Sequence, residues 1–438
     1  MDHSDGGSSI LRNNTVGNTT FQNSVPQAVG DAALTNVNGR TISPDVQNFL
    51  ATNVGALAGS TTNILDPNFK IPAVARATLS ADYRANLGPL GDGWNFGLAY
   101  LFSKQRDQVV FTDIRSVPSG LLLPDGRRRF IQNPGLTTAS NNVDILTTNS
   151  DAGRSHIFVA KFDKRFDFGL YFGGSYTRQD VTDASPATSS VANSNYTNAA
   201  FNDPNIQAVG TSNDETTWQF KYNLGFDHAF FEDYKTRFQL FGETRAGRRF
   251  SYTMQDNSSG RSPVFGTLGN LRNVLLYVPA VGNDARVSFD NPTTQASLET
   301  LINNSPLRNF RGQVAPRNVD RSRAFTRIDL HVEQEVPTFV GRSRITLFAD
   351  IENLPNLINR NWGGLRQQGF PYTSDVVRVQ CLNTVVATGT APTAGQIVTN
   401  SSQPCVQYRF TGFVAPNDSV IQTQQSLYFI RLGARVTF

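Results

Sequence analysis

The sequence predicts an all-β fold in which long antiparallel strands are joined alternately by short turns and by very long polar loops. Nine stretches alternate apolar with polar side chains, and successive side chains of a strand point to opposite faces. Charged residues make up only 17% of the chain, and Asn, Thr, Ser, Gln and Gly are abundant in their place. This composition is typical of turn-rich β structure rather than of helical bundles.

The alternation begins after a polar region, residues 1–68, which we expect to be a loop region with a short helix near 45–50. The expected strands cover residues 73–84, 94–103, 156–162, 168–176, 218–227, 237–245, 324–333, 344–352 and 428–438. Short turns are expected at 88–93, 164–167, 230–235 and 337–341. Long polar stretches are expected at about 116–153, 183–213, 254–321 and 357–424, with a small helix near 295–302.

This alternation of short and long connections indicates the kind of β protein. Polar loops of tens of residues argue against an ordinary compact domain, whereas outer-membrane β-barrels combine short periplasmic turns with long extracellular loops. The expected strands are also long enough to cross a bilayer when tilted. The pattern therefore predicts an antiparallel transmembrane β-barrel segment with residues 1–68 on the extracellular side. A single-chain bacterial barrel has an even number of strands, so about nine strands predict an incomplete barrel.

A secreted soluble β-protein would alternate in the same way, with its apolar face over a core. Two observations favour the membrane interpretation. The polar rows carry both signs of charge, as the lining of a lumen would, and the candidate lumen charges are Arg327, Asp329, His331, Glu333, Asp350 and Glu352. Aromatic residues near strand ends suit the aromatic girdles of membrane proteins; they are Tyr83, Trp94, Tyr176, Trp218 and Tyr428.

Four stretches carry a family pattern. They are LDPNFKIPAVARATLSADY (65–83), LRNFRGQVAPRNVDRSRAFTRIDLHVEQEVP (307–337), RITLFADIENLPNLINRNWG (344–363) and the terminal LYFIRLGARVTF. In this order they resemble the C-terminal portion of a TonB-dependent outer-membrane receptor, most closely the Oar-like group. The resemblance covers roughly residues 65–438 and implies that residues 69–438 are the C-terminal β-barrel portion of such a receptor.

The resemblance implies a function and a set of partners. The function would be energy-coupled uptake of a nutrient, here an unknown ligand, across the outer membrane of a Gram-negative cell. The partners would be outer-membrane lipid and lipopolysaccharide, the barrel-assembly machinery, and TonB through a plug domain. The terminal apolar row resembles the signal read by the assembly machinery, and its residues are Tyr428, Ile430, Leu432, Val436 and Phe438.

We expect the chain to be a fragment of such a receptor. The first residues, MDHSDGGSSI, have neither the basic nor the apolar region of a signal peptide, and no segment matches a plug. Nine strands alone would leave two unpaired edges in lipid. The alternative of another class is a porin-like or adhesive surface barrel whose long loops are the functional part.

No enzymatic activity, catalytic residue, cofactor or metal site is expected. The four histidines are scattered, without the spacing of metal ligands, and the motifs of nucleotide-binding or nucleophilic enzymes do not occur. The formal net charge of +4 is too small to indicate a nucleic-acid partner.

Two features of the long stretches are left as hypotheses. The segment GRRRF (126–130) either contacts lipopolysaccharide phosphates or is a solvated turn. Cys381 and Cys405 are the only cysteines, and both fall in the last long stretch. An even number of cysteines in an exported protein favours a disulfide between them.

Overall fold

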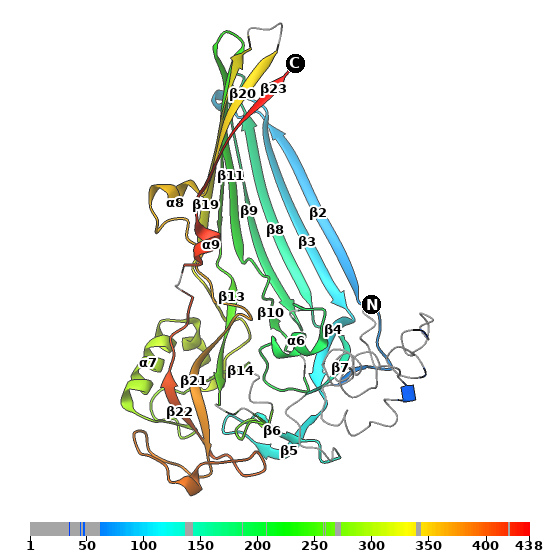
Figure 1. The fold of residues 1–438 in the computed structure, drawn as a ribbon, viewed down its shortest axis with the longest axis vertical. Coiled ribbons are helices and arrows are strands. Elements are labelled where there is room, and N and C mark those ends of the chain that lie inside the picture. Colours follow the sequence, from blue (N-terminus) through cyan, green and yellow to red (C-terminus); the bar gives the residue numbers. More distant parts are fainter. Residues whose placement is uncertain are drawn as a thin grey trace.

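The computed structural model describes residues 62–438, except 136–142, 186, 207, 257, 259, 268–272, 339–342 and 419–420, together with residues 35, 44, 47 and 48. The protein is all-β, with large antiparallel sheets. Figure 1 shows two parts: a long curved sheet, and a compact body at one end of its strands. Among the described residues, no helix combines the length and the apolar character needed to cross a membrane.

The long sheet contains all nine predicted strands as neighbours in an antiparallel series. Their bounds are β2 (Ala73–Ala85), β3 (Trp94–Arg106), β8 (Arg154–Arg165), β9 (Leu170–Asp183), β11 (Trp218–Phe231), β12 (Tyr234–Arg245), β19 (Phe325–Pro337), β20 (Arg344–Glu352) and β23 (Phe429–Thr437). The two-residue strand β10 (Gly210–Thr211) adds to β9. The predicted strands and their order are therefore confirmed.

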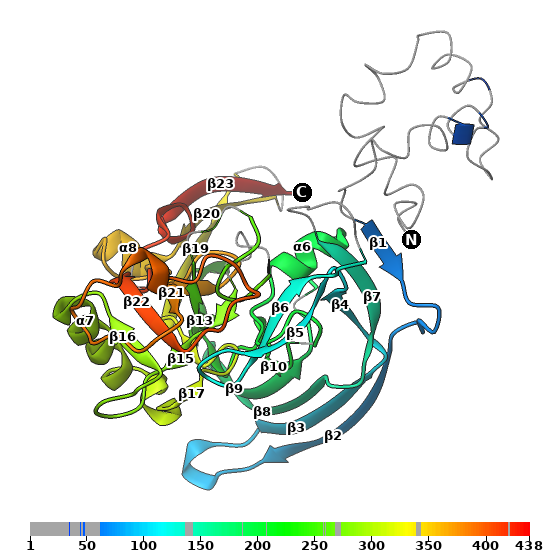
Figure 2. The same cartoon turned by 90° about the horizontal axis from the view of Figure 1, so that it is seen from below.

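The sheet is curved but open. Figure 2 shows the sheet as an arc, with β2 at one edge and β23 at the other. Within the described residues, neither edge strand has a second neighbour. The closed form of the sheet is thus not present, and each edge presents a row of unpaired backbone groups.

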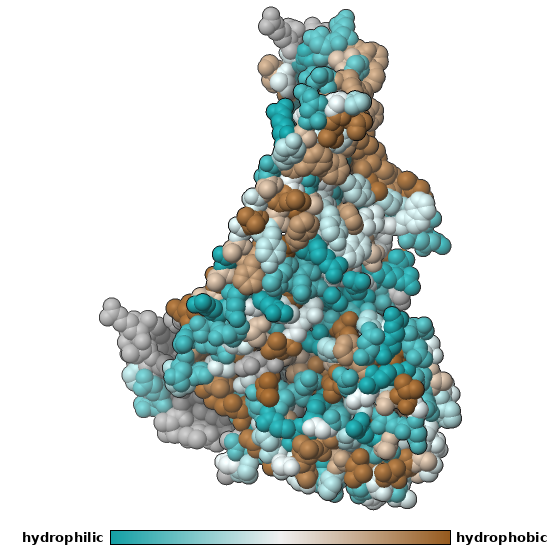
Figure 3. Space-filling model, turned by 180° about the vertical axis from the view of Figure 1, so that it is seen from behind, coloured by the Kyte–Doolittle hydropathy of each residue, from teal (hydrophilic) through white to brown (hydrophobic). Residues whose placement is uncertain are grey.

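One face of this sheet is apolar and exposed. Leu224 lies directly opposite Phe172 on β9 and Leu240 on β12, so the apolar rows of neighbouring strands form one surface. Leu79, Leu98 and Leu432 on this face are 75%, 54% and 76% exposed. Figure 3 views the outside of the arc, where brown and tan side chains lie over the strand region. An apolar surface of this extent is unusual on a protein surrounded only by water.

The four long connections are folded, which corrects their prediction as polar loops. They span 107–153, 184–217, 246–324 and 353–428, and we call them, together with β1, the loop domain. The strands are β1 (Thr62–Leu65), β4 (Gln108–Asp113), β5 (Ser116–Leu122), β6 (Arg128–Gln132), β7 (Asp144–Ser150), β13 (Arg249–Gln255), β14 (Val274–Leu275), β15 (Tyr277–Val278), β16 (Val287–Phe289), β17 (Gln313–Val314), β18 (Asp320–Arg321), β21 (Thr373–Leu382) and β22 (Gln407–Phe413).

The helices described between residues 62 and 438 lie on the connections between strands. They are η2 (Gly88–Leu90), α6 (Ala192–Thr197), α7 (Pro292–Asn303), η3 (Pro306–Phe310), α8 (Leu354–Ile358), η4 (Ala394–Gln396) and α9 (Thr423–Ser426). Helix α7 confirms the helix predicted near 295–302; Pro292 opens it and the Asn291 side chain caps it. The helix expected near 45–50 lies outside the described residues except for Gln47 and Asn48, which are helical. Strand β1 was not predicted, because it falls in the supposed N-terminal loop.

The loop domain has one shared hydrophobic core. Each connection contributes to it: Ile145 from the first, Phe201 from the second, Leu298 from the third and Tyr408 from the fourth are all at most 4% exposed. The connections are therefore one folded unit rather than four independent loops.

Arg129 links three connections inside this core. It is fully buried, and its Nε donates to the Val264 carbonyl at 2.8 Å. Its terminal nitrogens donate to the carbonyls of Pro263, Gln403 and Asn400. Burial lowers the pKa of Arg129 to about 10, so the guanidinium remains charged at neutral pH and its hydrogen bonds are charge-assisted.

The structure contradicts both hypotheses for GRRRF. Arg127 is buried against Asp125, with a 2.7 Å ion pair, and Arg129 is enclosed as described. Arg128 is ion-paired with Asp203. These arginines hold connections together, so the segment is neither a free phosphate site nor a solvated turn.

We predict that Arg129→Met destabilises the loop domain by about 3 kcal/mol, because a fully buried charged donor and its hydrogen bonds to four carbonyls are lost. The measurement is the free energy of unfolding in urea, with limited proteolysis of the loop domain as the probe of unfolding. The matched control is Arg128→Met: its side chain is 44% exposed, so the change should be within about 1 kcal/mol. Equal losses in the two variants would contradict the role assigned to Arg129.

Candidate functional site: a charge network on the polar face of the sheet

The six predicted lumen charges lie together on the polar face of β19 and β20. Arg327 contacts Asp329 at 2.9 Å and Glu352 at 2.7 Å. His331 places its Nδ1 2.6 Å from Asp350 and its Nε2 3.2 Å from Glu333. The register explains this, because His331 on β19 stands directly opposite Asp350 on β20. Cross-strand pairs of this kind stabilise sheets.

The structure extends this cluster with residues beyond the six candidates. Arg237 on β12 bridges Glu333 and Asp227, the second at 3.0 Å. Asp227 on β11 also accepts from Arg165 on β8 at 2.9 Å. Arg431 on β23 approaches Asp350 and Glu352 at 3.9 and 3.8 Å. In each of these strands one row of alternate side chains is mostly polar, and all of these residues fall on that row. The period of two in the sequence could therefore have identified them.

Together these residues form a continuous charge network across the sheet. Its members are Arg165, Asp227, Arg237, Arg327, Asp329, His331, Glu333, Asp350, Glu352 and Arg431. On β9, which contributes no charge, the Tyr171 ring lies 4.9 Å under the Arg165 guanidinium. Five carboxylates face four guanidinium groups and one imidazole, so the surface is nearly neutral and hydrated rather than strongly selective for one sign of charge.

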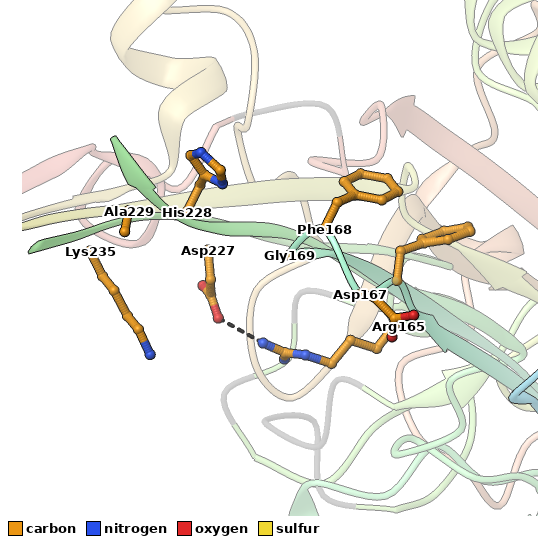
Figure 4. A pocket seen from close by; sticks show the side chains of 9 residues that line it. Arg165, Asp167, Phe168, Gly169, Asp227, His228, Ala229 and Lys235 are labelled. Atoms are coloured by element: carbon orange, nitrogen blue, oxygen red, sulfur yellow. Dashed lines mark hydrogen bonds and ion pairs between the residues drawn. The ribbon is translucent and has the colours of Figure 1, made fainter. Parts of the chain in front are cut away.

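The two faces are seen side by side near the short turns. In Figure 4, Arg165 reaches Asp227 on one side of the sheet, and Lys235 points to the same side. Phe168 and His228 point to the other side. Adjacent residues Asp227 and His228 thus lie on opposite faces, as the period of two requires.

The carboxylates and the imidazole of this network are paired with one another and with guanidinium groups. In the part of the chain that the structure describes, no group of three or more His, Cys, Asp or Glu side chains is arranged to hold a metal ion. Each carboxylate of the network instead accepts from, or pairs with, a guanidinium or imidazole.

Aromatic side chains on the apolar face form two groups along the strands. Near the loop domain, Tyr176 packs against Phe220 with ring centroids 4.7 Å apart, and Trp218 lies beside Phe220. Near the short turns, Trp94 packs against Phe172. Of the other predicted girdle residues, Tyr83 lies near the short turns and Tyr428 just before β23; both are exposed.

The terminal strand lies at the edge of the sheet. Ile430, Leu432 and Val436 stand opposite apolar residues of β20 and are 45%, 76% and 48% exposed. Phe438 follows the strand and is fully exposed. These residues form an accessible apolar row at the edge of the sheet, and their role as an assembly signal stays a prediction.

Cys381 and Cys405 form a disulfide inside the loop domain, with their Cα atoms 5.5 Å apart. Both residues are buried in the shared core. Cys381 lies in β21 rather than in a loop, and the bond joins that strand to the segment leading into β22. By the chain-entropy model, closing a loop of 24 residues contributes roughly 3 kcal/mol.

No protein-family model matches this chain, and neither curated proteins nor solved structures match it significantly.

We predict a measurable coupling between Arg237 and Glu333. In a double-mutant cycle with Arg237→Met and Glu333→Gln, the coupling free energy should be about 0.5–1 kcal/mol. The Glu333 carboxylate is shielded from water and belongs to a network of charges, and both raise the coupling above that of an exposed pair. Urea unfolding of the four proteins measures it.

The matched control for this cycle is the isolated pair of Lys161 and Asp82 on the same face, whose side chains are 59% and 69% exposed. The cycle Lys161→Met with Asp82→Asn should give no measurable coupling. If both cycles gave the same coupling free energy, the network would not strengthen the ion pair between Arg237 and Glu333.

Proposed function

We propose that this chain is the C-terminal part of an outer-membrane β-barrel and that the barrel serves as a TonB-dependent receptor for nutrient uptake. The observation that carries the proposal is the pair of faces of the long sheet. Nine consecutive antiparallel strands present an exposed apolar surface on one side and a cross-strand charge network on the other. A barrel wall between lipid and an aqueous lumen has this arrangement.

The positions of the aromatic residues agree with this proposal. On β11, Trp218 and Phe230 are near opposite ends of the strand, roughly 40 Å apart along it at about 3.3 Å per residue. With a tilt near 40°, this corresponds to a height of about 30 Å, close to the thickness of the hydrocarbon core. The secreted soluble alternative gives no reason for an uncovered apolar face of this height.

The open edges indicate what the rest of such a barrel must be. Because nine strands alternate in direction, β2 and β23 run the same way. A second copy of this sheet would therefore meet both edges with parallel strands, whereas a segment with an odd number of strands would meet both with antiparallel strands. In lipid, unpaired edges cost several kcal/mol per group. The remaining strands and the coupling plug of a receptor are not among the elements described above.

The loop domain supports the second candidate, an adhesive surface barrel, because it is a large folded body on the side of the long connections. In either case it belongs on the extracellular side, since the short turns face the periplasm in this class. Energy coupling distinguishes the two. For a receptor, uptake of its nutrient by cells that carry this chain together with the remaining strands and the plug should stop when TonB is deleted. Uptake that persists without TonB would exclude the receptor and favour a porin-like barrel, and the absence of any uptake would favour adhesion.

We predict that Leu224→Arg destabilises the protein in membranes by about 2–4 kcal/mol, the cost of a cation on the lipid face near the bilayer centre. The matched control is Asn223→Arg on the neighbouring polar row, which should change stability by less than about 1 kcal/mol. Urea unfolding in lipid vesicles, and the amount of folded protein in the outer-membrane fraction, measure both.

A soluble β-protein would give a different result. Leu224 is 48% exposed, so in water an arginine there should change stability by no more than about 0.5 kcal/mol. Equal behaviour of the two arginine variants would therefore exclude the membrane proposal.

A further inference from the structure

We infer that the segment Asn353–Gly363, which contains α8, is an anchor that lies in the headgroup region of the membrane at the loop-domain end of the sheet. This inference rests on the proposed barrel and adds a second type of lipid contact to it. Figure 1 shows α8 beside β19, projecting from the sheet at the level where β20 and β23 end. Its neighbour in the chain, β20, belongs to the apolar surface described above.

The segment is held in a fixed shape. The Asn353 side chain is buried and donates to the carbonyls of Gly363 at 3.0 Å and Ser426 at 2.7 Å. The Asn356 side chain donates to the Trp362 carbonyl at 3.1 Å and accepts from the Tyr428 amide at 3.3 Å. A Cβ on Gly363 would lie 2.0 Å from the Asn353 side chain, and its φ is +59°, so the closure needs glycine there.

This fixed shape leaves apolar side chains exposed. Ile358 is 67% exposed, Trp362 56% and Leu357 38%, and beside them Tyr428 is 46% exposed. Hydrogen bonds that close a segment while leaving an isoleucine and a tryptophan outside indicate a surface with an apolar partner. Figure 3 shows brown side chains on the projection that α8 forms at the side of the sheet.

The composition of the patch favours the headgroup region over the hydrocarbon core. Tryptophan and tyrosine concentrate at membrane interfaces, where the ring is in apolar surroundings and the polar atom remains hydrated. Arg360 is exposed between Ile358 and Trp362, and none of the ion pairs formed by the described residues includes it. An exposed cation among apolar side chains suits lipid phosphates. Continuity with the lipid-facing rows of β20 and β23 selects the bilayer rather than a soluble partner.

The experiment is depth-dependent fluorescence quenching by brominated lipids. The chain has three tryptophans, so Trp94→Phe with Trp218→Phe leaves Trp362 as the single reporter. The protein is purified from membranes and reconstituted in vesicles of phosphatidylcholine and phosphatidylglycerol. The phosphatidylcholine carries bromine either near the headgroup or deep in the acyl chain. Trp362 should lie about 5–10 Å below the vesicle surface and be quenched more strongly by the shallow bromines.

Two further reporters, in a background that also carries Trp362→Phe, separate the failure of this inference from that of the proposed barrel. Leu224→Trp reports the lipid face of the sheet and should be quenched by the deep bromines. Val281→Trp, at a position of the loop domain that is 81% exposed, should not be quenched. If Leu224→Trp is quenched and Trp362 is not, or if Trp362 responds mainly to the deep bromines, the anchor is wrong and the barrel stands. If Leu224→Trp is not quenched, both are wrong.

Discussion

In the long sheet, the side chains of each row meet only side chains of the same row on the neighbouring strands, so a slip of one residue would exchange the two faces. Such a slip would bring Lys221 to the apolar surface and Leu224 to the charge network. Close contacts prevent it. The Tyr222 ring lies over Gly242, where a Cβ would come within 2.0 Å of the ring, and the Tyr171 ring lies over Gly225 in the same way. An aromatic ring packed over a glycine on the next strand fits at one register only, and the charge network depends on that register.

The loop domain depends on the same sheet, because its connections start and end at strand termini. Arg317 pairs with Asp183, at the end of β9, and donates to the Thr211 carbonyl at 3.0 Å. Glu215 accepts from the Val181 amide at 2.8 Å with one oxygen and contacts Arg249 at 2.7 Å with the other. These buried charge-assisted contacts join the third connection to the second and to β9. They also attach the loop domain to the sheet at the end of β9.

The sequence predicts the long sheet well because its strands are long and one face of each is apolar, which makes a period of two visible over 9–14 residues. The same signal assigns the six charges of β19 and β20 to one face. The period of two also places Asp227 on the polar row, but it does not identify Arg165 and Arg237 as its partners, because pairing across strands decides those contacts. The loop domain was missed for another reason. Many of its strands are only two or three residues long, too short to show a period of two, and in β14 and β16 every residue is buried. The partners of Arg129 are main-chain carbonyl groups, which every residue has, so the amino-acid sequence does not identify them.

The shared core of the loop domain has a consequence for the order of folding. Thr253 of β13 bonds Asp375 of β21, 122 residues later, and Arg129 awaits the Gln403 carbonyl, 274 residues later. Contacts this distant in sequence form slowly, because long stretches of chain must be brought together first. The first connection can already bond the second, through Arg128 and Asp203, and the third, through Arg129 and Val264. Its contacts with the fourth connection span the longest stretch of chain, so we expect them to complete the shared core last.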